Sequence, residues 1–175
     1  MTSSDANERR EAIGRAVEQG EVHALPRLYK VDLAVDGYEA AAAIGGVGKL
    51  SALLPVGERV DAVRTLARWL GQESRRQAPG ALGNAVLAIE ALGETKSPAA
   101  AQPLIEALDG AQLPLHVETR IVQALGDLDA REAAPAVRRF VDRVGRRTPT
   151  DDFEKQLCAE ALVEAGAVLK KLGAP

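Results

Sequence analysis

The chain has 175 residues, of which 46% are hydrophobic and only 3% aromatic, and its formal net charge is −3. The length suffices for one buried core, and alanine, at roughly a fifth of all positions, favours closely packed helices. The acidic balance argues against a protein whose main task is to bind nucleic-acid phosphates. We therefore expect a single all-α domain over residues 1–175, without membrane insertion.

The first repeated element lies near the N-terminus, in "HALPRLYKV" (His23–Val31), where alanine, proline and an aliphatic residue follow one another at Ala24, Pro26 and Leu28.

The first twenty residues contain no apolar run of the kind that a secretory signal needs. Cys158 is the only cysteine, which excludes an intramolecular disulfide and agrees with a reducing compartment. We expect a cytoplasmic protein.

The next stretch, "IGGVGKLS" (Ile44–Ser51), superficially suggests a phosphate-binding loop. Such a loop needs a glycine five residues before its Gly-Lys pair and a hydroxyl residue directly after the lysine. Those positions hold Ala43 and Leu50, so the motif is absent. We interpret the glycines as a break between two helices. A second apolar helix face follows, ended by Gly71, and consists of Val60, Val63, Leu66, Ala67 and Leu70.

The clearest repeat pairs "AIEALGETKSPAAAQPLIEAL" (88–108) with "IVQALGDLDAREAAPAVRRFV" (121–141). In each copy an apolar helix pattern reaches Gly93 or Gly126, which we expect to end the helix in the left-handed conformation. A polar turn follows, in which Ser97 or Asp129 could cap the next helix. We expect Leu92, Leu108, Leu125 and Val137 to be buried between helices. The second helix of each copy begins around a proline, Pro103 or Pro135, which should loosen its first turn.

The last predicted element is a helix over 149–172, which closes the array. Asp151 lies at a capping position, and Lys170 and Lys171 suit the C-terminal end of the helix dipole. Its apolar stripe consists of Phe153, Leu157, Ala161, Ala165, Val168 and Leu172.

A helix pair of this size has too small a core to be stable alone, so neighbouring pairs should stack into a right-handed α-solenoid of about four to five pairs. The string Ala-Leu-Gly, polar turn, alanine, proline and aliphatic residue resembles the bacterial HEAT-like repeats first named for phycobilin lyases. The likeness is clearest over 80–145, and the repeats over 6–75 are degenerate. The resemblance implies that the second helices line a concave surface. This concave surface would display Arg27, Gln102, Glu106, Arg138 and Asp142.

Catalytic and metal-binding patterns are absent from the sequence. His23 and His116 stand apart, and we interpret each as a partly buried or capping residue. Cys158 has no base nearby in the sequence and is expected to be a buried thiol. Asp151 and Asp152 are adjacent carboxylates that suit a helix start. We predict no enzyme activity, no metal and no cofactor.

Arg138, Arg139 and Arg143 form the densest basic cluster of an acidic chain. They could form a solvated helix face or a patch for an acidic or mixed-charge protein surface, with a nucleic acid as the less favoured partner. We expect that replacing all three with glutamate would leave the fold intact and weaken partner binding.

The leading hypothesis is a non-enzymatic scaffold or adaptor that binds another protein. The resemblance also allows a subunit similar to a bilin lyase or a maturation factor, which holds a client or a chromophore. A DNA glycosylase would need aromatic and acidic residues around a flipped base on a basic face, and the few aromatic residues argue against it.

Overall fold

The computed structural model describes residues 5–34, 37–76, 78, 80–110 and 112–173. All regular structure within these residues is helical and none of it is strand, so the expected all-α class is confirmed. The α-helices are α1 (Ala6–Glu18), α2 (Leu25–Leu28), α3 (Gly37–Ala52), α4 (Val60–Glu73), α5 (Ala81–Glu94), α6 (Ala101–Gly110), α7 (Leu115–Asp127), α8 (Ala134–Gly145) and α9 (Asp152–Lys171). Short 3-10 helices η1 (Val22–Ala24), η2 (Val56–Glu58), η3 (Pro98–Ala100) and η4 (Arg131–Ala133) lie between them.

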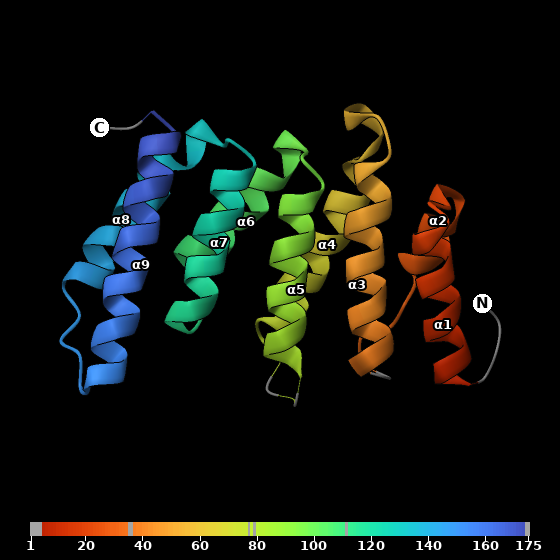
Figure 1. Ribbon diagram of the computed structural model, residues 1–175, viewed down its shortest axis with the longest axis horizontal. Helices are drawn as coiled ribbons and strands as arrows, with labels where there is room; N and C mark the ends of the chain where they lie inside the picture. The colour runs from red at the N-terminus through yellow and green to blue at the C-terminus, as the bar shows by residue number, and fades with distance from the viewer. Residues whose placement is uncertain (1–4, 35–36, 77, 79, 111, 174–175) are drawn as a thin grey trace. The chain divides into compact units, whose positions relative to one another are not determined.

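The chain divides into two compact units, Met1–Ser97 and Pro98–Pro175. In the first unit α1, α3 and α5 pack side by side, while α2 contacts α3, and α4 contacts α3 and α5 (Figure 1). In the second unit α7 packs against α9, and α6 and α8 contact each other on the other side of this pair (Figure 1). Each unit therefore has two layers of helices. The single domain remains a prediction.

The four aliphatic residues expected between helices are all buried, which confirms the helix faces on which that expectation depends. Leu92 and Leu125 are fully inaccessible, and so is Val137, while Leu108 is 1% exposed. Two details of α4 differ from the prediction. Val60 is half exposed, and the helix continues through Gly71 to Glu73, so Gly71 does not end it.

The turns after α5 and α7 correct the expected role of their glycines. Gly93 and Gly126 lie within the last turns of the helices, and the left-handed residues are Lys96 (φ 48°) and Asp129 (φ 52°). The N–H of Ala130 donates to the carbonyl of Leu125 at 3.2 Å, which closes a Schellman-type helix end around Asp129. Asp129 is therefore part of this turn and does not cap η4, whose N-terminal flank is Ala130.

Gly126 instead permits close packing of two helices. A Cβ atom on this residue would lie 2.9 Å from Cγ2 of Val168 on α9. That distance is shorter than a carbon–carbon contact allows. The glycine is required by the neighbouring helix, which the sequence pattern alone did not reveal.

The expectation that the glycine-rich stretch separates two helices is also wrong, because α3 continues through it. A Cβ on Gly46 would lie 3.2 Å from Leu28 Cδ1, and one on Gly48 would lie 2.8 Å from Cβ of Ala91 on α5. Two glycines on one helix thus allow close approach on two sides, and this packing explains the stretch that resembles a phosphate-binding loop.

The prolines of the second helices lie where the sequence predicts an unusual first turn. Pro26 and Pro135 occupy the first or second position of α2 and α8, and Pro103 is the third residue of α6. A 3-10 helix precedes each of them. Proline is tolerated there because the first turn of a helix does not require its missing N–H.

The closing helix begins at Asp152, three residues later than predicted. The side chain of Asp151 accepts a hydrogen bond of 2.7 Å from the N–H of Glu154, which confirms the expected cap. Ala161, Ala165 and Leu172 are buried, but Phe153 is 71% exposed and does not belong to the buried stripe. It lies in the first turn, before Cys158, the first buried residue of α9.

Candidate partner-binding surface

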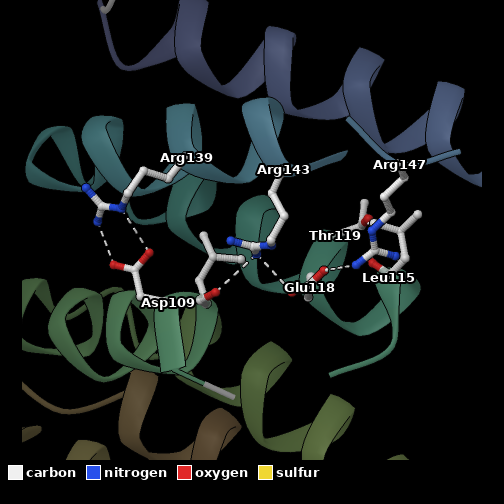
Figure 2. Close-up of polar contacts among 8 residues, drawn as sticks. Asp109, Leu115, Glu118, Thr119, Arg139, Arg143 and Arg147 are labelled. Atoms are coloured by element: carbon white, nitrogen blue, oxygen red, sulfur yellow. Dashed lines mark hydrogen bonds and ion pairs between the residues drawn. The ribbon is translucent and has the colours of Figure 1, made fainter. Parts of the chain in front are cut away.

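Arg139 and Arg143 of α8 reach toward neighbouring helices, as Figure 2 shows. Arg139 forms a bidentate pair with Asp109 on α6, with distances of 3.1 Å from Nε to Oδ1 and 2.5 Å from Nη2 to Oδ2. This hydrogen bonding raises the pKa of Arg139 above its ordinary value. Both side chains are substantially exposed, so the pair contributes orientation more than stability.

Arg143 is engaged more deeply. Its Nη2 lies 2.9 Å from Oε1 of Glu118 on α7 and 3.2 Å from the carbonyl oxygen of Leu108 on α6 (Figure 2). Its guanidinium also lies 5.7 Å from the ring centre of Phe140. The Glu118 side chain is only 5% exposed, and Arg147 approaches its other oxygen at 3.4 Å. Because a buried carboxylate needs compensation, Arg143 links α8 to α6 and α7, and Arg147, just after α8, adds a second pairing with Glu118.

Four of the predicted surface residues remain exposed on two packed second helices, α6 and α8. They are Gln102, Glu106, Arg138 and Asp142, and we name this set the α6–α8 ridge. Gln102 donates to Glu106 at 2.9 Å along α6. The ridge carries both signs of charge within one unit. Arg27 is exposed as well, but it belongs to α2 of the first unit.

A second group of basic side chains lies along the C-terminal half of α4 and just after it in the first unit, and the sequence analysis does not predict it. A hollow of about 600 Å³ is lined by Ala67, Arg68, Gly71, Gln72, Arg75 and Arg76, and we name it the α4 hollow. Arg68, Gln72 and Arg75 follow one another at spacings of four and three, which places them on one helix face. This spacing is the sequence signal that could have identified the site.

A groove of about 290 Å³ lies between α7 and α9 in the second unit. Its charged lining consists of Arg120, Glu160 and Glu164, with His116 at one side. Two of these side chains already have neighbours on their own helices: Arg120 donates to Gln123 at 3.1 Å, and Glu160 accepts from Gln156 at 2.8 Å. The groove therefore offers mixed polarity without a converging set of groups.

The remaining candidate residues do not converge on a reactive centre. His23 and His116 are both exposed, which corrects the interpretation of partly buried histidines, and His23 lies 3.4 Å from Glu21. Cys158 is buried, as expected. Among the described residues no three histidine, cysteine or carboxylate side chains are grouped as metal ligands.

Comparisons with known proteins add no family to this description. No protein-family model matches the chain, and a search of curated proteins finds no match. None of the described helices combines the length and the apolar character that crossing a membrane requires.

Proposed function

We propose that this chain is a non-enzymatic binding module, a HEAT-like α-solenoid that holds another protein on the exposed side of its second helices. Support comes from recurrent geometry as well as from recurrent residues. A left-handed residue follows α1, α5 and α7, at Gly20, Lys96 and Asp129, and a 3-10 helix then leads into the next helix. The same connection at three places is what a stack of similar units requires.

The observation that carries the proposal is the α6–α8 ridge. Its four side chains are exposed, whereas the backbone beneath them is fixed by the Arg139–Asp109 pair and by the pairing of Arg143 with Glu118. A rigid ridge loses little conformational entropy on binding. Its carboxylates, Glu106 and Asp142, would repel phosphates, so the mixed charge favours a protein surface over a nucleic acid.

Arg139 and Arg143 enter this proposal in a different role from the one that the sequence suggests. Their guanidinium groups already have carboxylate partners within the unit. They orient the ridge. Arg138 is exposed on the same helix, and on that ground we expect it to contact a partner protein.

Site-specific photo-crosslinking in the native host tests the proposal. A photoreactive amino acid replaces Gln102 or Arg138 in one experiment and the exposed Lys155 on α9 in the control. We expect one protein to be crosslinked from both ridge positions and not from position 155. The substitution Arg138→Glu should then weaken binding of that protein about tenfold or more, whereas Lys155→Glu should not. Equal crosslinking from all three positions, or equal affinities of the two variants, would contradict the proposal.

A further inference from the structure

The α4 hollow in the first unit carries guanidinium charge that the fold does not neutralise. Arg68 is exposed, and its Nη2 donates to the carbonyl oxygen of Tyr29 at 3.0 Å. Arg75 is exposed too, and its guanidinium has no hydrogen bond or ion pair among the described residues. Neither arginine has a carboxylate partner there.

Arg76 also lines the hollow, but its charge is neutralised within the fold. Its Nη1 lies 3.0 Å from Oε1 of the buried Glu73 and 3.0 Å from the carbonyl oxygen of Leu33. Asn84 donates to the other oxygen of Glu73 at 2.9 Å. This network stabilises the fold and leaves the charges of Arg68 and Arg75 for an external group.

The lining of the hollow includes two small residues. They are Gly71 and Ala67, and a Cβ atom built on Gly71 would have no other atom within 4 Å. The amide of Gln72 lies between the two arginines in sequence and can donate or accept a hydrogen bond. The backbone carbonyl holds Arg68 in place while leaving other N–H groups of its fork unused, which prepares it for a carboxylate.

We propose that the α4 hollow binds an acidic segment of a partner protein, whose carboxylates pair with Arg68 and Arg75. A protein segment fits better than a nucleic acid, because two uncompensated arginines give weak phosphate binding and the hollow has no aromatic lining for bases to stack on. The hollow belongs to the first unit and shares no residue with the α6–α8 ridge, so either site can fail without the other.

The test uses a fluorescent oligo-glutamate peptide and a thymidine oligonucleotide of equal length, titrated with the full chain at low ionic strength. We expect the peptide to bind more tightly than the oligonucleotide. The double variant Arg68→Gln/Arg75→Gln should weaken peptide binding about tenfold or more, because it removes both charged hydrogen-bond partners of the carboxylates.

The matched control is Arg15→Gln/Arg64→Gln, which changes the net charge equally. Both of its arginines are exposed in the same unit, and they already pair with Glu11 at 3.7 Å and with Asp61 at 2.8 Å. This variant should retain peptide binding to within about twofold, since such exposed pairs contribute little.

A second pair of variants tests the hollow without removing charge. The substitution Gly71→Leu should fill the hollow and abolish peptide binding, whereas Gly83→Leu, at an exposed position of α5 with open space around it, should not. Urea denaturation of every variant checks that it is folded. The proposal is overturned by an absence of peptide binding, by preference for the oligonucleotide, or by equal losses in the matched controls.

Discussion

Arg143 on α8 and Glu118 on α7 form an ion pair of 2.9 Å in which the carboxylate is almost fully buried and the guanidinium is partly exposed. The pair joins two helices of different layers in the second unit. Arg143 also donates to the last turn of α6, so one side chain of α8 contacts two neighbouring helices. An arginine that sequence analysis assigns to a binding patch is therefore a structural element of its unit.

Reversing the charge at Arg143 should destabilise the second unit. Arg143→Glu would place a second carboxylate beside Glu118, and we expect a loss of about 2–4 kcal/mol in the free energy of unfolding. Arg138→Glu, an exposed change on the same helix, should alter it by no more than about 0.5 kcal/mol. Urea denaturation of both variants measures the difference, and equal midpoints would contradict the structural role of Arg143. The triple glutamate variant is therefore expected to lose stability, contrary to the expectation from sequence.

A methyl group at Gly126 should also destabilise the second unit. In Gly126→Ala the new Cβ would lie 2.9 Å from Val168 Cγ2, and we expect a cost of about 1–3 kcal/mol from overpacking. The double variant Gly126→Ala/Val168→Ala should recover part of that cost. At Gly166, where no atom lies near the added Cβ, alanine should stabilise the helix by roughly 0.5–1 kcal/mol. Thermal denaturation of the three variants measures their order of stability. If Gly126→Ala were more stable than Gly166→Ala, α7 and α9 would not be in close contact.

Shortening a buried leucine tests each unit separately, with Leu92 in the first and Leu125 in the second. Both side chains are completely inaccessible, so Leu92→Ala and Leu125→Ala should each cost about 2–5 kcal/mol through lost burial and a residual cavity. Leu53, which is 62% exposed, is the control, and its replacement with alanine should cost well under 1 kcal/mol. Denaturant midpoints that do not separate the buried from the exposed position would refute the assigned helix faces.

The start of α9 should depend on pH through Glu154. Two hydrogen bonds from Thr150, one from its N–H and one from its hydroxyl, lower the pKa of Glu154 below its ordinary value of 4.5. Because the pKa is lower in the folded state, the stabilisation is complete above the ordinary pKa of the unfolded chain. It is lost as the pH falls through the lowered pKa of the folded chain. Amide-exchange protection in the first turn of α9 should decrease in that range. In Glu154→Gln the decrease should be smaller, and an identical profile for both chains would exclude Glu154 as the titrating group.

The sequence predicts much of the fold because its signals are local. Buried leucines at helical spacing, prolines in the first turns and the cap at Asp151 all depend on neighbouring residues, and the structure agrees with each. The sequence does not predict the role of these glycines, because the residues that require them are distant in the chain. Gly48 and Gly126 are required by the side chains of Ala91 and Val168, which only the packed helices bring near.

The candidate surface was predictable only in part, for the same reason. Exposure of Arg138 and Gln102 follows from their position on a helix, and it is observed. The pairing of Arg139 with Asp109 and of Arg143 with Glu118 spans 30 and 25 residues, and no periodicity in one helix reveals it. The basic face of the α4 hollow follows from the spacing of its arginines along the helix. The hollow itself exists because two small residues, Ala67 and Gly71, lie between long side chains.

Trp69 is the only tryptophan and Cys158 the only cysteine, and each is buried in a different unit. The unmodified chain therefore contains two independent probes. Fluorescence of the indole reports on the first unit, and the reactivity of the thiol toward an aromatic disulfide reports on the second. Coincident transitions in urea would mean that the whole chain unfolds as one cooperative system, and separate transitions would assign a stability to each half.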